Sequence, residues 1–401
     1  MAVEEVIVTS MKKLLIVNAG SASKKYAVYE GEAELFRAHF ERGENGFMVT
    51  EYAGGAHNTR AITDTEYTES ARRFYEDCVA RGIVKEGEMS ALGFRVVAPG
   101  EYFNATRSID PEYLKKLQEA YLIAPLHVHA VMNEISAFFA LMPQTQRIGV
   151  SDSAFHATIP EQARLYALPI EDSKALGIYR YGYHGISVRS ALAAVERLLG
   201  AVPARVVVCH LGSGASVTAI HNGASIDTSM GFTPLEGLAM ATRVGDIDAG
   251  ALIHLGKAKG LSYDQLDEYC NHECGLSGLS GGVDGGVREL LVRAAAGDTD
   301  AKRALDVFTY RIKKYIGAYS AALGGCDAVV FTGTIGERSA DIRARVCEGL
   351  SALGIALDDA KNRAVTGDAD RLIGLDDMAA TIAVVRADEM RQIAKETRSF
   401  A

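Results

Sequence analysis

The sequence predicts a two-domain α/β protein with a duplicated architecture, and three observations lead to that fold class. The chain has 401 residues, which is more than one ordinary hydrophobic core organises, so two domains are expected. Apolar residues make up 48% of the chain and charged residues 23%, as in a well-packed globular protein. A strand, a turn of small polar residues and a second strand occur near residue 14 and again near residue 205. This repetition predicts two related halves with a cleft between them.

In the first half, short apolar runs predict strands and longer periodic stretches predict helices. Residues 14–17 and 26–29 predict two strands that form a hairpin. Helices are expected over 66–82 and 111–122, and a strand over 147–150 leads into Asp152. An acidic residue at the carboxyl end of a strand lies where open α/β sheets bind ligands.

The second half contains the same pieces. Strands are predicted at 205–210 and 217–221 around the small polar turn 211–216, and Asn222-Gly223 predicts the next turn. Later elements are a strand at 328–331, a turn at 332–337, a helix at 339–353, a strand near 380–385 and a helix near 388–397. No linker rich in Pro or Ser separates the halves, so short connections are expected.

Composition excludes several classes of protein. The net charge of −9 argues against a general nucleic-acid or membrane-surface binder, and no secretory signal or transmembrane run is recognised. Six scattered cysteines suggest reduced thiols in the cytoplasm rather than a disulfide framework. Cys270–Cys274 admits a metal site, although its spacing is not a standard zinc pattern; the alternative is a helix end.

Three turns of small residues point to phosphate chemistry. Gly20–Ser23, Gly212–Ser216 and Gly333–Gly336 each follow an apolar strand directly. Glycine lets backbone N–H groups approach an anion, and Ser or Thr adds hydroxyl donors. A structural turn explains any one of them, but three together favour a nucleotide. None matches the Walker or dinucleotide patterns.

The segment 227–248 is long and irregular, and such loops usually serve function. Within it, Arg243 suits a phosphoryl clamp, because a guanidinium offers a fork of donors and stays charged. A structural ion pair with Asp246 or Asp248 is the alternative, and the sequence leaves both open.

Several segments then carry a family resemblance. Asn18–Tyr26 resembles the opening signature of the acetate kinase family, and Asp227–Asp248 resembles its second signature. Further segments follow the family's order and spacing: Asp152–His156, Tyr181–Gly185, His210–Gly214 and Phe331–Glu337. The resemblance runs from about Lys12 to Thr397 and implies a duplicated actin-like (ribonuclease H-like) fold with a central interdomain cleft. It implies an N-terminal domain at 12–156 plus 386–401, and a nucleotide-binding domain at 157–385.

The resemblance also implies a function. It implies a Mg²⁺-dependent carboxylate kinase that transfers a phosphoryl group directly and reversibly between ATP and acetate, giving acetyl phosphate and ADP. A cytoplasmic homodimer acting on small molecules is implied, without nucleic-acid or membrane partners. The alternatives are a propionate or butyrate kinase, a pyrophosphate-dependent acetate kinase, and an actin-like nucleotide-binding protein without kinase activity.

Each matching position receives an implied role. The implied catalytic residues are Arg95, Asp152, His184 and Arg243. The implied carboxylate-binding residues are Arg95, Val97, Leu126, His127 and Pro234. The implied nucleotide- and phosphate-binding residues are Ser21, Ser23, Lys25, His210, Leu211, Gly212, Ser213, Gly214, Gly286, Val287, Arg288, Gly333, Thr334, Ile335, Gly336 and Glu337. The implied ligands of Mg²⁺, or alternatively Mn²⁺, are Asn18 and one of the adjacent acids Asp388 and Glu389.

These roles fit phosphoryl transfer, which needs in-line positioning and positive charge around the transferred group. Plainer readings exist for single residues: His184 as a packed or capping residue, Lys25 as an exposed strand residue, and Asp388 and Glu389 as acids at a helix start. Departures from the usual family residues gather around the nucleotide and acyl pockets, at Phe94, Ala98, Pro99, Tyr183, Val188, Ser213, Gly286, Thr334 and Asp388. The acyl chain length and the phosphoryl donor therefore stay open.

Overall fold

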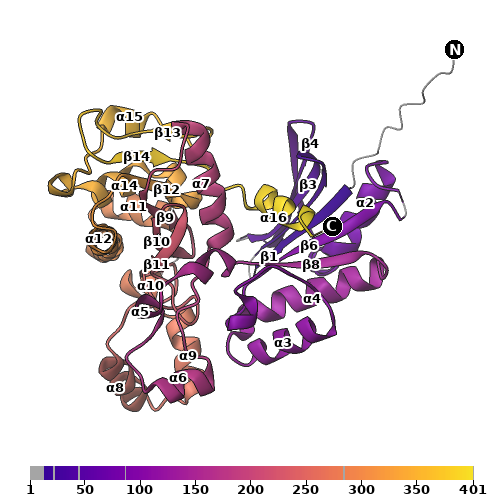
Figure 1. Ribbon diagram of the computed structural model, residues 1–401, viewed down its shortest axis with the longest axis horizontal. Coiled ribbons are helices and arrows are strands. Elements are labelled where there is room, and N and C mark those ends of the chain that lie inside the picture. Colours follow the sequence, from indigo (N-terminus) through magenta and orange to yellow (C-terminus); the bar gives the residue numbers. More distant parts are fainter. Residues whose placement is uncertain (1–12, 21–22, 44–45, 86, 283–284, 401) are drawn as a thin grey trace. The chain divides into compact units, whose positions relative to one another are not determined.

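The computed structural model describes residues 13–20, 23–43, 46–85, 87–282 and 285–400, and these form two compact units (Figure 1). Unit 1 runs to Ala98, continues through Ala105–Asp152 and resumes at Glu389, and unit 2 holds Pro99–Asn104 and Ser153–Asp388. The domain boundaries predicted from the sequence, which differ from these by a few residues, stay a prediction. Within the described ranges, no helix is both long and apolar enough to cross a membrane.

Unit 1 is built on an eight-stranded sheet in the order β5-β4-β3-β2-β1-β6-β8-β7. Its strands are β1 (Lys13–Ala19), β2 (Ser23–Glu30), β3 (Ala33–Gly43), β4 (Gly46–Ala53), β5 (Ala56–Ile62), β6 (Met89–Val96), β7 (Arg107–Ser108) and β8 (Gln146–Ser151). Its helices are α1 (Asp64–Thr68), α2 (Ser70–Ala80), α3 (Pro111–Tyr121), α4 (Pro125–Leu141) and α16 (Glu389–Arg398). The hairpin predicted for the first two strands is confirmed, since β1 and β2 pair antiparallel.

Unit 2 is built on a six-stranded sheet in the order β11-β10-β9-β12-β14-β13. Its strands are β9 (Arg205–Leu211), β10 (Ala215–His221), β11 (Ala224–Thr228), β12 (Ala328–Thr332), β13 (Arg371–Leu372) and β14 (Thr381–Val384). Its helices are η1 (Glu101–Phe103), η2 (Ala154–Thr158), α5 (Glu161–Arg164), α6 (Ile170–Leu176), α7 (Gly185–Leu199), α8 (Ala249–Lys259), α9 (Tyr263–His272), α10 (Gly275–Leu279), α11 (Val287–Ala295), α12 (Thr299–Ala322), α13 (Gly333–Arg338), α14 (Ala340–Cys347), η3 (Ser351–Leu353) and α15 (Asp359–Arg363).

The two sheets share one pattern, which confirms the duplicated α/β fold. In unit 1 the central order is β3-β2-β1-β6-β8, and in unit 2 it is β11-β10-β9-β12-β14. In both, the first three strands pair antiparallel and the next two add in parallel. The carboxyl ends of the three parallel strands therefore meet at one edge of each sheet, where ligands usually bind.

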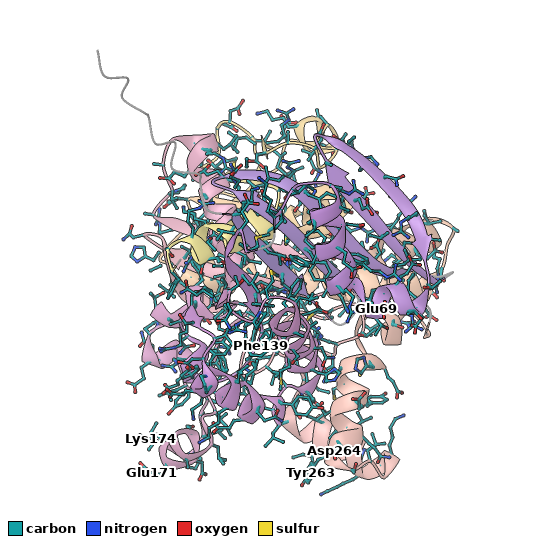
Figure 2. All side chains as sticks on the ribbon, turned by 90° about the vertical axis from the view of Figure 1, so that its right-hand side faces the viewer. Glu69, Phe139, Glu171, Lys174, Tyr263 and Asp264 are labelled. Carbon is teal, nitrogen blue, oxygen red and sulfur yellow. The ribbon has the colours of Figure 1, made fainter. Side chains whose placement is uncertain are left out.

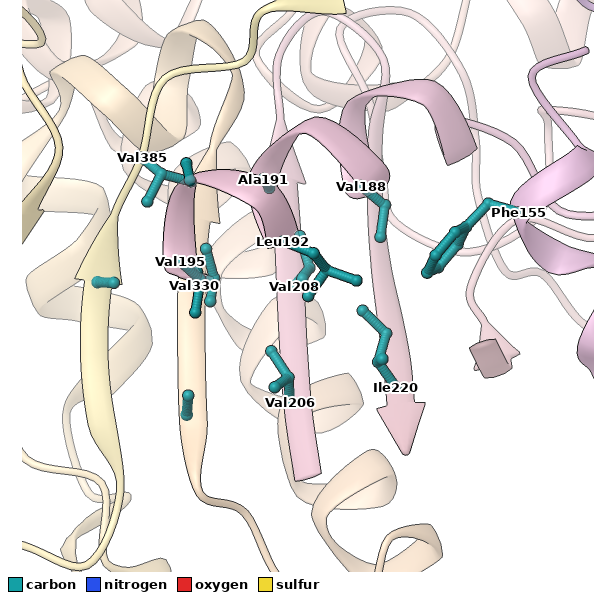
Figure 3. Packing of buried hydrophobic residues seen from close by; sticks show 13 residues of the cluster. Phe155, Val188, Ala191, Leu192, Val195, Val206, Val208, Ile220, Val330 and Val385 are labelled. Carbon is teal, nitrogen blue, oxygen red and sulfur yellow. The ribbon is translucent and has the colours of Figure 1, made fainter. Parts of the chain in front are cut away.

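Helix α7 shows how the unit 2 core forms (Figure 3). Its apolar residues recur at helical spacing, as at Val188, Leu192 and Val195, so one face of the helix is apolar. That face packs on the sheet, where Val206, Val208, Ile220 and Val330 are fully buried. Burying each such side chain is worth about 1.5–3 kcal/mol.

Helix α16, at the carboxyl end of the chain, belongs to unit 1. It packs on β1 and β6, and Gly93 of β6 permits the close approach, because a Cβ atom there would overlap the side chain of Thr397. The predicted terminal helix is confirmed, and it brings Glu389 to the strands of unit 1.

The helix predicted over 339–353 is wrong in its bounds. Helix α13 begins at Gly333, directly after β12, and Ser339 adopts an extended conformation before it caps α14. Gly349, with φ of 78°, follows the end of α14. The expected turn at Gly333–Gly336 is therefore the first turn of a helix. The helix expected over 66–82 is likewise divided, by Glu69, into α1 and α2.

The cysteines of this fold are not joined in disulfides. All six cysteines are free thiols, and Cys270 lies in the last turns of α9, the helix end weighed above. Figure 2 shows exposed side chains on the outer helices. Glu171 and Lys174 of α6 form an exposed pair at 3.4 Å, which stabilises little because water screens it.

Candidate active site

In unit 1, four polar side chains meet where the parallel strands end. Asn18 and Arg95 lie one residue before the ends of β1 and β6, and Asp152 follows β8 directly. Arg95 Nη2 donates to Asp152 Oδ2 at 2.9 Å, and Arg95 Nη1 donates to Asn18 Oδ1 at 3.3 Å. Glu389, at the start of α16, accepts from Asn18 Nδ2 at 2.8 Å. The structure thus brings together Asn18, Arg95, Asp152 and Glu389.

Charge balance in this cluster depends on Arg95. Its guanidinium is largely buried, which opposes its charge, but the carboxylates of Asp152 and Glu389 together raise the pKa of Arg95 above its ordinary value. Asp152 is fully buried, and Glu389 Oε2 lies 3.9 Å from Arg95 Nη1. Because a buried charge is costly without a partner, the ion pair with Asp152 offsets the cost of burying the Arg95 guanidinium.

The donor set fits a hard divalent cation only in part. Glu389 offers a carboxylate and Asn18 an amide oxygen, the ligand type that Mg²⁺ prefers. The described residues contain no group of three or more His, Cys, Asp or Glu side chains that could hold a metal. Mg²⁺ commonly takes one or two protein ligands and completes its shell with phosphate and water, so this pair fits that usage. Asp388 belongs to unit 2, where its backbone N–H donates to Ser190 Oγ at 3.0 Å.

The other unit 1 candidates lie near this edge or are not described. Val97 follows β6 and is half-buried, and Lys25 of β2 pairs in register with Asn18. Ser23 begins β2, and its carbonyl oxygen accepts from Gly20 N at 2.8 Å. Ser21 lies outside the described residues, as do the side chains of two residues in the first turn of α4, Leu126 and His127.

In unit 2, His184 lies beside the turn between β9 and β10. The His184 imidazole is buried and stacks on that of His210, with ring centroids 4.2 Å apart. His184 precedes α7 in a left-handed conformation, with φ of 61°, but its side chain makes no capping hydrogen bond. A Cβ atom at Gly214 would lie 3.3 Å from His184 Nε2 and 3.7 Å from Arg243 Nη1. The structure therefore brings His184, His210 and Arg243 together around the glycine turn.

Arg243 is a cation without a carboxylate partner among the described residues. Its Nη1 donates to the carbonyl oxygen of Pro234 at 3.3 Å, and burial alone lowers the pKa of its guanidinium. The alternative of an ion pair with Asp246 or Asp248 is wrong. Asp246 accepts from Gly237 N and from a tyrosine hydroxyl, and Asp248 caps α8 through Ala251 N. A partly buried cation without a counterion favours an anionic ligand.

The loop that carries Arg243, here called the Arg243 loop (residues 229–248), is held along its backbone by the segment 270–277. The hydrogen bonds are Val244 N to Cys270 O, Cys274 N to Thr242 O, Leu276 N to Met240 O and Ser277 N to Ala241 O, at 2.8–3.0 Å. Gly275, with φ of 61°, is required here, because a Cβ atom would overlap the Met240 carbonyl. The sequence analysis assigned Gly275 no role.

A partly buried ion pair holds the first part of the Arg243 loop. Arg180 Nη2 donates to Glu236 Oε1 at 2.7 Å, and Arg180 Nη1 donates to Thr228 O at 2.9 Å. Tyr166 donates a short hydrogen bond to Glu236 and accepts from Phe232 N. Although Arg180 is partly buried, Glu236 raises the pKa of its guanidinium. Sequence reasoning missed this pair, although Glu236 lies inside the family signature and is the one acidic residue between Asp227 and Arg243.

Two predicted nucleotide segments also meet in unit 2. Gly333, with φ of 77°, lies so close to β9 that a Cβ atom would overlap the backbone of Leu211. Glu337 Oε1 accepts from Gly333 N at 3.0 Å and from Ala387 N at 2.9 Å, and burial raises its pKa. The turn Gly212–Gly214 is closed by a hydrogen bond from Gly212 N to Gly214 O at 3.0 Å.

The remaining candidates belong to helix starts. Gly286 is the N-cap of α11, and Val287 and Arg288 form its first turn, with Arg288 exposed. Thr334 and Ile335 lie in α13. Sequence reasoning missed Arg343, which is fully buried and donates to Asn362 Oδ1, Asn362 O, Gly336 O and Glu337 O at 2.7–3.0 Å. Burial lowers its pKa to about 10, and these bonds hold the end of α13.

Known proteins resemble this chain over nearly its whole length. A family model described as the acetokinase family matches residues 13–395. The acetate kinase of Phocaeicola vulgatus is 39% identical over 394 residues, covering 96% of this chain and 98% of that protein. The crystal structure of Porphyromonas gingivalis acetate kinase superposes with a TM-score of 0.85 at 35% identity, covering 97% and 99% of the two chains. A propionate kinase from Francisella tularensis superposes with a TM-score of 0.88 at 32% identity, covering 97% and 100%. The resemblance predicted from the motifs is confirmed over nearly the full length: the chain belongs to the acetokinase family.

Proposed function

We propose that this enzyme is a carboxylate kinase that transfers a phosphoryl group reversibly between ATP and acetate. One observation carries the proposal: Arg243, a partly buried cation without a carboxylate partner among the described residues, lies with His184 around the Gly214 turn. Phosphoryl transfer spreads negative charge over three equatorial oxygens, and prearranged donors stabilise that charge. Arg243 and His184 supply such donors without further rearrangement.

The unit 1 cluster suits the carboxylate side of the reaction. Arg95 offers a guanidinium to an anionic substrate or phosphoryl oxygen, while Asp152 holds that guanidinium by the 2.9 Å hydrogen bond. Acetate is already an anion at neutral pH, so its attack on phosphorus needs no general base. Asp152 therefore orients Arg95 and balances its charge rather than removing a proton.

The phosphate chain of ATP is proposed to bind the glycine turn Gly212–Gly214 and the start of α13. Backbone N–H groups at glycine turns and helix starts readily donate hydrogen bonds to phosphate oxygens. Asn18 and Glu389 are proposed to hold Mg²⁺, which neutralises phosphate charge when it is bound. The contacts of Asp388 with unit 2 favour Glu389 as the acid that meets the ion.

A propionate kinase is the second candidate, because the propionate kinase of F. tularensis superposes on this chain with a TM-score of 0.88. Acyl selectivity depends on small differences in an apolar pocket, and one methylene changes discrimination by roughly 10–200-fold. Val97 of unit 1 and Pro234 of unit 2 are the described residues to which the resemblance assigns carboxylate binding.

The test is a substrate panel that crosses ATP, GTP and pyrophosphate with acetate, propionate and butyrate, read as acyl hydroxamate. The highest kcat/KM is expected for ATP with acetate, and Arg243→Ala should lower the rate of product formation with every pair by about 10²–10³-fold. A higher kcat/KM for propionate would select the second candidate. The absence of product with every pair would refute a carboxylate kinase.

A further inference from the structure

His184 contacts a buried serine hydroxyl through one of its two ring nitrogens. His184 Nδ1 lies 3.0 Å from the Oγ atom of Ser216, which is fully buried at the start of β10. Within the described ranges, His184 is the one hydrogen-bond partner of this hydroxyl. The Ser216 hydroxyl therefore makes one hydrogen bond, to His184 Nδ1. The direction of that bond determines whether Nε2 of the neutral ring carries the proton.

The direction of that bond follows from counting hydrogens. A hydroxyl has one hydrogen, and a buried O–H group that finds no acceptor loses free energy. If Nδ1 donated to Ser216, the hydroxyl hydrogen would have no acceptor among the described residues. If Ser216 donates to Nδ1, both groups are satisfied. Neutral His184 then carries its proton on Nε2, the nitrogen that lies near Gly214 and Arg243.

Two other histidines of unit 2 show the same arrangement. His156 Nε2 lies 2.9 Å from the carbonyl oxygen of Tyr183, which can only accept, so Nδ1 accepts from Ser225 Oγ at 2.9 Å. His210 Nδ1 lies 2.7 Å from Ser187 Oγ. At neutral His156 the Tyr183 carbonyl group requires the Nε2–H tautomer, whatever the serine does. The count of hydroxyl hydrogens assigns the same tautomer to His184.

We propose that Ser216 is a positioning residue that holds neutral His184 as the Nε2–H tautomer, so that His184 donates to an anionic oxygen beside Arg243. The kinetic consequence rests on the proposed kinase activity, but the tautomer does not. The imidazole donates without being protonated first, so its hydrogen bond to a phosphoryl oxygen does not require a second positive charge beside Arg243.

The tautomer is measured directly by long-range ¹H–¹⁵N correlation spectra of the full chain with ¹⁵N-labelled histidine, at a pH where the imidazoles are neutral. Comparison with His184→Asn assigns the signals of His184. A wild-type His184 protonated on Nε2 is the expected result. In Ser216→Ala the His184 nitrogens should shift toward a mixture of tautomers, and in Ser216→Thr, which keeps the hydroxyl, they should return.

Kinetics supply the second measurement. Ser216→Ala should lower kcat about tenfold and leave KM for ATP within about twofold, since a donor to the transition state is weakened while the phosphate turn remains. Ser225→Ala is the matched control: it removes an equivalent buried hydroxyl from His156, whose bond to Tyr183 remains, and should leave kcat within about twofold.

Two results would overturn the proposal. One is a wild-type His184 that carries its proton on Nδ1, which needs no variant to fold. The other is a Ser216→Ala enzyme with an unchanged tautomer and unchanged kcat. If the chain has no kinase activity but Ser216→Ala alters the tautomer as expected, the positioning role stands and the proposed function alone fails.

Discussion

Removing either of the two proposed active-site arginines, Arg95 or Arg243, should slow catalysis strongly, but only one of the two removals should destabilise the protein. Arg95 pairs with the fully buried Asp152, whereas Arg243 has no carboxylate partner among the described residues. Alanine at either position deletes the same charge. Arg95 lies beside a carboxylate, whereas Arg243 has none among the described residues. Comparing the two variants therefore separates a loss of catalysis from a loss of stability.

The magnitudes follow from these contacts. Arg95→Ala removes the cation that pairs with the buried carboxylate of Asp152, and breaking a buried ion pair typically costs about 3–5 kcal/mol. For a unit of this size that corresponds to a fall in Tm of roughly 6–20 °C, at about 2–4 °C per kcal/mol. Arg243→Ala loses one long hydrogen bond to oxygen, from Nη1 to Pro234 O at 3.3 Å, worth about 0.5–1.5 kcal/mol, and a weaker one to Met240 Sδ at 3.6 Å. It also relieves an uncompensated buried charge, so its Tm should change by no more than about 4 °C.

Hydroxamate formation from ATP and acetate measures activity, and scanning calorimetry measures stability on the same samples. Both variants should lose about 10²–10³-fold in kcat, the usual effect of removing a donor to a developing negative charge. Arg303→Ala, an exposed arginine paired with Asp300 within α12, is the control and should alter neither quantity. An Arg243→Ala protein that loses as much stability as Arg95→Ala would refute the reasoning, because Arg243 would then have a structural partner. Near-normal activity in both variants would refute the assigned roles.

Three further predictions concern residues that hold the site. Glu236→Gln weakens the bond to Arg180 and should lower kcat about tenfold and stability by about 1–3 kcal/mol, measured by the same assays; unchanged kcat would show that the Arg243 loop does not depend on this pair. Gly275→Ala should lower kcat and Tm together, whereas Gly260→Ala, with a similar φ but open space around its Cβ position, should lower only Tm, slightly. Arg343→Lys should raise KM for ATP several-fold with KM for acetate nearly unchanged, because it frees the end of α13; equal changes in both constants would contradict that role.

Three central strands were predictable because they are buried on both faces. Residues 14–17, 206–209 and 328–331 are continuous apolar runs, and each lies in a central strand, whereas the central strand β6 was not predicted. Strands β3, β4 and β5 were not predicted, since exposed polar residues alternate with apolar ones and β5 is exposed along nearly its whole length. The helix boundaries near 339 failed for a local reason, because Ser339 ends one helix in an extended conformation and caps the next.

The candidate site shows a different limit, because a counterion is a property of three-dimensional packing. Arg243 lies within five residues of two aspartates, and sequence distance alone makes an ion pair as reasonable as a phosphoryl clamp. Gly245, with φ of 70°, lies between Arg243 and Asp246 in the chain. The carboxylates of Asp246 and Asp248 accept hydrogen bonds from backbone N–H groups, those of Gly237 and Ala251. Conversely, Glu389 is 371 residues from Asn18 and yet only 2.8 Å away. The two carboxylates that are close to Arg243 in sequence therefore bind backbone groups instead. The carboxylate that lies beside Asn18 belongs to Glu389, in the last helix of the chain. The family signature locates the residues of such a site, and the absence of a counterion for Arg243 among the described residues supplies the physical reason to expect an anion beside it.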